Sequence, residues 1–178
     1  MNRTKNLYCI LGKSGVGKTT AVDRLENEYG YKVLKSYTTR APRHKDDTDH
    51  TFISLKEYAD MPNKVATCEF HGNFYCATSE QVDESDLYVI DCAGIKELKE
   101  RYSGDKKIIV IQITATIEEC LERMLNRGDS EDVAWDRLKH DYVAFKDADE
   151  LSDYNIPSNH QPSVVAAIKH IIEYEEVK

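Results

Sequence analysis

The chain has 178 residues, a length that suits one domain built around a single core. Its 24 Lys and Arg residues are outnumbered by 32 Asp and Glu residues, which gives a net charge of −8. An acidic chain has no general positive field that would hold nucleic acid or an anionic membrane. We therefore expect neither partner, and any phosphate site must be built locally.

Five cysteines are scattered through the chain without a C-x-x-C pair, which argues against a zinc site or a disulfide framework. The first residues lead into an apolar run without a signal-peptide pattern, and no apolar run approaches membrane-spanning length. We therefore expect reduced thiols in a cytoplasmic protein, present as a monomer or a homodimer.

The first predicted element is a strand at residues 7–11, followed by Gly-Lys-Ser-Gly-Val-Gly-Lys-Thr at residues 12–19. This segment fits G-x-x-x-x-G-K-[S/T], the pattern of a phosphate-binding P-loop between a strand and a helix. The backbone N–H groups of such a loop turn inward, which leaves space only for small residues at Gly12, Gly15 and Gly17.

The helix after this loop is expected at residues 18–29 and directs its positive end at bound phosphates. Lys18 would lie along the β- and γ-phosphates of a nucleotide, and the Thr19 hydroxyl would ligate the Mg²⁺ that bridges them. We predict ATP as the phosphoryl donor and Mg²⁺ as the cofactor. The predicted ATP-binding residues are Gly12, Lys13, Ser14, Gly15, Val16, Gly17, Lys18, Thr19 and Thr20.

A second phosphate-binding segment is predicted at residues 35–43, after a short strand expected at residues 31–34. Arg40 and Arg43 flank Pro42 there, and hydroxyl-bearing side chains lie just before them. An Arg side chain pairs with phosphate oxygens through two parallel hydrogen bonds, and nearby hydroxyls orient the same group. Composition alone leaves two interpretations open, an acceptor-phosphate site and a solvated basic loop.

The middle of the chain indicates an α/β protein. Apolar runs at residues 87–91 and 107–113 are typical of strands buried on both faces, and a helix is expected between them at residues 95–102. Capping boxes that begin at Ser54 and at Thr116 predict the starts of two further helices. Buried strands that alternate with helices favour a parallel sheet.

Two later helices carry arginines. Arg123 and Arg127 lie four residues apart on a helix expected at residues 116–128, so they project from one face. Arg137 lies on a helix expected at residues 133–148. These cations either reach into one phosphate site or are solvated arginines paired with nearby glutamates. A helix that swings would assemble them only when both substrates are bound.

These segments together resemble the guanylate kinase family. In that family a P-loop is followed by a segment like Ser-Tyr-Thr-Thr-Arg-Ala-Pro-Arg at residues 36–43, then by a short D-Y-x-F strand, where this chain has Asp-His-Thr-Phe at residues 49–52. Residues 70–75 resemble the family's G-N-Y-Y-G element, and the three arginines of the later helices fall near its lid arginines. The resemblance spans nearly the whole chain.

The resemblance implies a nucleoside monophosphate kinase that transfers a phosphoryl group directly from ATP to GMP or dGMP. A phosphoryl group in transfer carries spread negative charge, so catalysis consists of positioning and cations. The catalytic residues carried over are Lys18, Arg40, Arg123, Arg127 and Arg137, and the acceptor-binding residues are Ser36, Arg40, Arg43, Tyr75 and Asp91.

The chain departs from the family's pattern where guanine is recognised. Ala66 replaces an acidic residue, and Val89 replaces the first of two acids on one strand, so that Asp91 alone remains. Loss of one charge-assisted hydrogen bond would weaken discrimination for guanine by about ten- to a hundredfold. Glu69 lies an odd number of residues from Ala66 and would therefore point to the opposite face of its strand.

Two residues keep open roles. Asp91 either faces the base amine, as the resemblance implies, or lies near Mg²⁺ at the carboxyl end of its strand, as a plain P-loop fold suggests. His50 stands near the position of the family's D-Y-x-F tyrosine, and the sequence does not say whether it or Glu69 takes part in recognising a base.

We predict a P-loop NTPase-type α/β fold, a doubly wound parallel sheet with an inserted nucleoside-monophosphate-binding lobe and a helical lid. The core is expected at residues 1–35, 87–127 and 150–178, the acceptor-binding lobe at residues 36–86 and the lid at residues 128–149.

Two alternative functions stay open. A guanylate kinase-like phosphokinase acting on another acceptor, such as ribose 1,5-bisphosphate or a different nucleoside monophosphate, would explain Ala66. A non-catalytic module that binds a phosphorylated ligand is the third reading, and the intact Lys18 and Thr19 argue against it.

Overall fold

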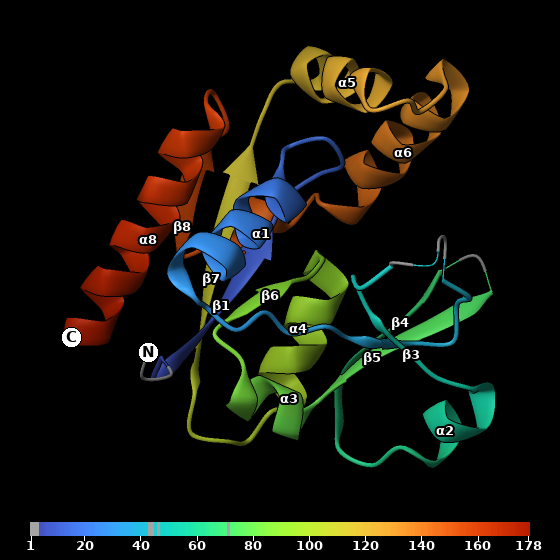
Figure 1. The fold of residues 1–178 in the computed structure, drawn as a ribbon, viewed down its shortest axis with the longest axis vertical. Helices are drawn as coiled ribbons and strands as arrows, with labels where there is room; N and C mark the ends of the chain where they lie inside the picture. The colour runs from blue at the N-terminus through green and yellow to red at the C-terminus, as the bar shows by residue number, and fades with distance from the viewer. Residues whose placement is uncertain (1–3, 43–44, 46, 71) are drawn as a thin grey trace.

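The computed structural model describes residues 4–42, 45, 47–70 and 72–178. Two four-stranded sheets organise this part of the chain (Figure 1). The first is fully parallel, as predicted, and its strand order is β6-β1-β7-β8. Its strands are β1 (Asn6–Leu11), β6 (Leu87–Val89), β7 (Lys107–Thr114) and β8 (Tyr154–Pro157).

Helices cover both faces of the parallel sheet, and this explains why β1 is apolar from Leu7 to Leu11. Tyr8 and Ile10 point to one face, whereas Leu7, Cys9 and Leu11 point to the other, and all five side chains are fully buried. The first face packs against α1 (Lys18–Tyr29) and α8 (Gln161–Val177), and the second against α4 (Cys92–Arg101) and α7 (Ala148–Leu151).

The second sheet is mixed and lies to one side of the first (Figure 1). Its order is β3-β2-β5-β4, in which β2 pairs parallel with β3 and the other pairs are antiparallel. Helix α4 packs against β4 and so connects the two sheets. The elements of this lobe are β2 (Tyr37–Thr38), β3 (Thr51–Phe52), α2 (Leu55–Asp60), β4 (Lys64–Phe70), β5 (Asn73–Thr78) and α3 (Ser79–Glu84).

Helices α5 (Ile117–Asn126) and α6 (Glu131–Ala144) follow β7 and extend beyond the carboxyl end of the parallel sheet (Figure 1). The capping box of α5 is present as predicted, because Thr116 Oγ1 accepts from the Glu119 N–H and the Glu119 carboxylate accepts from the Thr116 N–H. No helix in the described part of the chain is long and apolar enough to span a bilayer.

The prediction of a strand at residues 31–34 is wrong. The segment runs beside β6, but only Val33 forms a bridge, with Leu87. The Asp86 carboxylate accepts the Lys32 N–H at 2.8 Å, so a side chain takes a hydrogen bond that a regular ladder would need. The contact joins residues far apart in sequence, which local pattern could not anticipate.

The bounds predicted for a helix at residues 133–148 also differ from those in the structure. Ser130 Oγ accepts from the Val133 N–H, and α6 therefore begins earlier than expected, at Glu131. It ends at Ala144, where Phe145 leaves the helical conformation and packs against the core on the α4 side of the sheet. A separate short helix, α7, begins only at Ala148.

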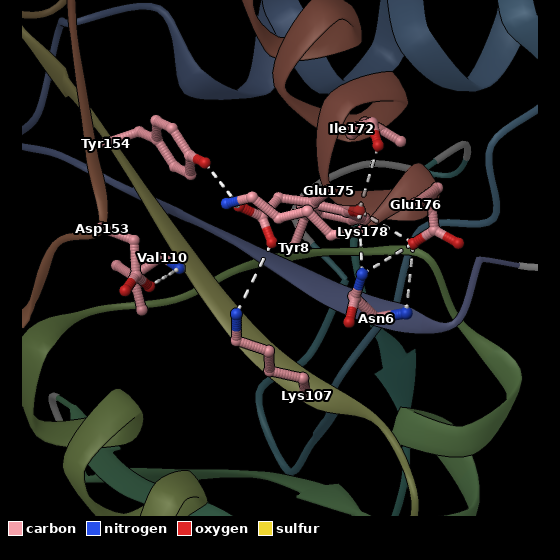
Figure 2. A network of polar contacts seen from close by, with 10 residues as sticks. All are labelled: Asn6, Tyr8, Lys107, Val110, Asp153, Tyr154, Ile172, Glu175, Glu176 and Lys178. Carbon is pink, nitrogen blue, oxygen red and sulfur yellow. Dashed lines mark hydrogen bonds and ion pairs between the residues drawn. The ribbon is translucent and has the colours of Figure 1, made fainter.

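Polar contacts fasten the end of α8 to the strands beside it (Figure 2). The Glu176 carboxylate accepts from Tyr8 Oη at 2.8 Å and from Asn6 Nδ2 at 2.9 Å. The Glu175 carboxylate accepts from Tyr154 Oη at 2.5 Å and Lys178 Nζ at 2.8 Å. The Lys178 and Tyr154 hydrogen bonds lower the pKa of Glu175 to about 2.

We expect Glu175→Gln to lower the thermal unfolding midpoint by about 2–4 °C at pH 7, because it removes a charged hydrogen-bond acceptor. Since the folded-state pKa lies below the ordinary value of 4.5, this contribution is complete above about pH 4.5 and is lost as the pH falls toward 2. The difference between variant and wild type should therefore shrink over that interval. Glu173→Gln, which alters an exposed pair with Lys169 on the same helix, is the matched control and should shift the midpoint little.

Candidate active site

The P-loop runs from the end of β1 to α1, which begins at Lys18 as predicted. Gly15 and Gly17 have φ angles of 82° and 95°, which residues with a side chain rarely adopt. A Cβ on Gly15 would lie only 2.6 Å from the carbonyl oxygen of Cys120 in α5. The loop therefore has the backbone conformation and the crowding that its glycine pattern predicts.

A cavity of about 650 Å³ opens beside this loop, and we call it the donor cavity. Most of the predicted ATP-binding residues and the three arginines of the later helices line it, together with the segment that starts α8. The lining residues from the predicted sets are Ser14, Gly15, Gly17, Lys18, Thr19, Thr20, Arg123, Arg127 and Arg137. Segments far apart in the sequence thus bring their cations to one place.

The Lys18 ammonium folds back over its own loop and donates to the carbonyl oxygens of Gly12 at 2.5 Å and Lys13 at 3.0 Å. Burial lowers the pKa of Lys18 to about 8, the Asp141 carboxylate raises it, and the Arg137 and Arg127 guanidiniums lower it further. A polyphosphate that enters the donor cavity would stabilise this ammonium.

Arg123 joins three segments around the donor cavity. Its Nη2 donates to the Ser158 carbonyl oxygen at 2.6 Å, and its Nη1 donates to Ser158 Oγ at 3.0 Å. Ser158 Oγ in turn donates to the Val16 carbonyl oxygen at 2.7 Å. Arg123 therefore fixes the segment before α8 against the P-loop, besides lining the cavity.

Arg127 and Arg137 converge on one carboxylate. Arg127 Nε donates to Asp129 Oδ2 at 3.1 Å, its Nη2 contacts the same oxygen, and Arg137 Nη1 lies 3.5 Å from it. The hydrogen bond from Arg127 lowers the pKa of Asp129, so this carboxyl stays ionised. Two guanidiniums are thereby held side by side at the mouth of the donor cavity.

A second cavity, of about 140 Å³, lies between the two sheets, and we call it the acceptor cavity. The predicted residues Ser36, Tyr75 and Asp91 line it, and so does His50. Ser36 Oγ and His50 Nδ1 are hydrogen-bonded at 3.0 Å, and the His50 ring packs edge-on against Tyr75 with centroids 5.3 Å apart. Hydroxyl and imidazole groups of this kind suit a phosphate oxygen.

The rest of the acceptor cavity is small and mostly uncharged. Ala66, Cys68 and Val89 line it, whereas Glu69 does not, as the odd offset along the strand predicts. Asp91 is the N-cap of α4, and its Oδ1 accepts from the Gly94 N–H at 2.7 Å. Of the two roles open for Asp91, its place at the acceptor cavity favours contact with the base.

Arg40 lies in the second sheet's lobe but lines neither cavity. Its Nη2 pairs with Asp47 Oδ2 at 3.1 Å, and its guanidinium lies over the Phe52 ring. Among the described residues, Arg40 Nε is buried and has no hydrogen-bond partner. A buried donor without an acceptor marks a place where a ligand oxygen would be favourable. The predicted residue Arg43 lies outside the described residues.

Sequence reasoning missed three polar residues around the donor cavity. The Asp129 carboxylate accepts from Arg127, the Asp141 carboxylate accepts from the Ser14 N–H, and Ser158 accepts from Arg123. None belongs to a motif with fixed spacing. Asp141 and Ser158 contact partners distant in sequence, whereas Asp129 pairs with Arg127 two residues before it. Only the acidic segment at residues 129–132 gave a signal, and its composition predicted a mobile segment before the helix of the lid.

The residues at the donor cavity fit a nucleotide-bound Mg²⁺. No cluster of three or more His, Cys, Asp or Glu side chains that could hold a metal ion occurs within the residues described. Mg²⁺ in phosphoryl-transfer sites usually takes one or two protein oxygens and completes its shell with phosphates and water. The Thr19 hydroxyl is exposed and lies at the donor cavity, which suits that mode.

Comparison with known proteins decides the family. Residues 4–175 match the family model described as Guanylate kinase. The chain belongs to the guanylate kinase family. It is 30% identical over 191 residues to a guanylate kinase of Geobacter metallireducens, which covers 100% of this chain and 93% of that protein. A guanylate kinase of Prochlorococcus marinus is 32% identical over 149 residues, or 77% of this chain and 80% of that protein.

Solved structures agree with the family assignment. A guanylate kinase from Anaplasma phagocytophilum matches with a TM-score of 0.65 at 25% identity and covers 100% of this chain and 90% of that one. A gluconokinase from Sinorhizobium meliloti shares the fold alone. It is 12% identical, with a TM-score of 0.54, and the match covers 98% of this chain and 95% of that one. The predicted membership of the guanylate kinase family and the predicted P-loop α/β fold are confirmed.

The depressed pKa of Lys18 leads to a testable pH dependence. Only the ammonium form attracts phosphate, so we expect affinity for ATP to fall as the pH rises through about 8. Because bound phosphate raises the pKa again, binding above that pH should take up a proton. Calorimetric titrations between pH 7 and 9.5, in buffers of different ionisation enthalpy, measure both effects. Lys18→Arg, which stays charged, should abolish the decline, and an unchanged decline in that variant would contradict the assignment to Lys18.

Proposed function

We propose that this protein transfers the γ-phosphoryl group of ATP to GMP or dGMP, yielding ADP and GDP or dGDP. The observation that carries the proposal is the presence of two separate cavities, one beside the P-loop and one between the two sheets. The donor cavity gathers Lys18 and three arginines, and the acceptor cavity presents hydroxyl, imidazole and carboxylate groups. Membership of the guanylate kinase family supports the same reaction.

The proposed roles follow from charge. The P-loop N–H groups and Lys18 bind the donor phosphates, and Arg123, Arg127 and Arg137 stabilise the charge that spreads over the group in transfer. Ser36, Arg40, Arg43 and Tyr75 hold the acceptor phosphate. The phosphates of bound ATP would carry Mg²⁺, which neutralises their charge, with the Thr19 hydroxyl as the protein ligand.

The proposed division of the chain places the core at residues 1–35, 87–127 and 150–178, the acceptor-binding lobe at residues 36–86 and the lid at residues 128–149. The lid brings Arg137 and Asp129 over the donor cavity, and its closure would exclude water from the reacting phosphate. A phosphate oxygen would first contact the unpartnered Nε of Arg40, and a phosphate that took both hydrogen bonds of that edge would displace the Asp47 carboxylate from Nη2.

A second acceptor class has specific support. Ala66, Cys68 and Val89 give the acceptor cavity a wall with no charge to match guanine, so Asp91 would be the acid that recognises the base. A smaller phosphorylated acceptor such as ribose 1,5-bisphosphate would use the same phosphate-binding groups without needing that wall.

A coupled assay with MgATP and a panel of GMP, dGMP, AMP, CMP and UMP tests the proposal. We expect turnover of GMP and dGMP, and we expect Lys18→Ala to lower kcat by about 10²–10³-fold, because it removes a cation that acts in the transition state. No turnover of any monophosphate would refute the proposal. Inhibition by the sugar bisphosphate without inhibition by GMP would favour the second acceptor class.

The role of Asp91 is tested with Asp91→Asn. Asparagine is also a good N-cap, so α4 and the unfolding midpoint should be preserved. We expect KM for GMP to rise about tenfold, because a charge-assisted hydrogen bond is lost, while KM for ATP stays unchanged. IMP, which lacks the 2-amino group of guanine, should lose much less than GMP. If KM for ATP rises and KM for GMP does not, Asp91 does not recognise the base.

A further inference from the structure

A carboxylate already engages the P-loop. The Ser14 N–H, at the rim of the donor cavity, donates to Asp141 Oδ2 at 2.5 Å. Asp141 belongs to α6, which passes beside the loop between β1 and α1 (Figure 1). The Asp141 side chain is 8% exposed, so this contact is made away from bulk water. Such burial makes a charge-assisted hydrogen bond stronger than it would be at the surface.

The contact has the chemistry of phosphate recognition. Inward-facing N–H groups of a P-loop bind anionic oxygens, and a carboxylate oxygen and a phosphate oxygen present the same acceptor to them. The negative charge of Asp141 also supports the Lys18 ammonium against burial. Asp141 thus satisfies, from within the chain, two groups that a polyphosphate would use.

We propose that Asp141 is an internal competitor for the phosphate chain of the donor, so that donor binding requires the carboxylate to leave the Ser14 N–H and releases α6 from the loop. One N–H cannot donate fully to two anions, and two anions at one place repel each other. Asp141 is therefore a positioning residue that couples donor binding to the movement of the lid. This proposal rests on the proposed function only in taking ATP as the donor, and it does not depend on the identity of the acceptor.

A purely structural role predicts the opposite outcome. If Asp141 only supported the loop in its binding conformation, its removal would loosen the loop and weaken polyphosphate binding. If it competes, its neutralisation strengthens binding, because the site no longer has to lose an internal anion first. The sign of the change separates the two roles.

The test is calorimetric titration of Asp141→Asn with inorganic tripolyphosphate, a probe that needs no nucleoside and no acceptor. We expect Asp141→Asn to bind tripolyphosphate about 10- to 100-fold more tightly than wild type, which is the change in affinity that one charge-assisted hydrogen bond produces. In steady-state assays KM for ATP should fall while KM for GMP stays unchanged. Asp136→Asn removes the same charge from an exposed position of the same helix and should bind tripolyphosphate as wild type does. Unchanged or weaker binding by Asp141→Asn would overturn the proposal.

A measurement on the wild-type protein guards against a variant that fails to fold. In NMR titrations with tripolyphosphate, the Asp141 carboxyl carbon and the backbone signals around it in α6 should shift together with those of the P-loop. If the loop signals shift and Asp141 stays unperturbed, the carboxylate remains in place and the proposal fails. Neither the calorimetric nor the NMR titration involves an acceptor. Absence of GMP phosphorylation would therefore refute the proposed function without deciding whether Asp141 competes with the donor phosphates.

Discussion

Positive charge gathered to bind phosphate has to be balanced, and in this protein carboxylates on neighbouring segments balance it. Asp129 accepts from Arg127 and lies 3.5 Å from Arg137, and Asp47 pairs with Arg40 at 3.1 Å. The Arg40–Asp47 pair is largely buried, and attraction between buried charges is several-fold stronger than in bulk water, so this pair helps to determine where its loop lies. The pairs of Asp129 are more exposed and therefore weaker, but they hold two guanidiniums at one place.

The carboxylates also lie where a moving lid would need them. Asp129 precedes α6 and accepts from Arg127, and Asp141 lies near the end of α6 and accepts from the Ser14 N–H of the P-loop. Both ends of α6 are therefore joined to groups that line the donor cavity. A phosphate that replaces a carboxylate leaves the charge of the site balanced, and the exchange therefore changes the free energy much less than breaking an ion pair outright. Charge exchange of this kind lets a lid be well ordered and yet able to move.

Features that depend on contacts between residues close in sequence were predicted better than features that depend on contacts between distant residues. The bounds of α1 and the capping boxes of α2 and α5 rest on contacts within a few residues, and the sequence alone predicted them. The strand expected at residues 31–34 failed because Asp86, distant in sequence, takes the Lys32 N–H. The same limit applies to the site: motif spacing located its cations, whereas Asp141 contacts Ser14 across the fold and belongs to no motif.

In the proposed function, acceptor selectivity would depend on a single carboxylate that also caps a helix. Asp91 caps α4 through one oxygen, and this hydrogen bond fixes the direction in which the rest of the carboxylate faces the acceptor cavity. At the other side of the cavity, Ser36 and His50 form a pair suited to any phosphate monoester. In the proposed function, affinity for the phosphate and selectivity for the base would therefore come from different elements. The hydrogen bond from the Gly94 N–H would hold the Asp91 carboxylate in the direction that recognition of a base needs, because a group that is already positioned binds its ligand without first losing freedom.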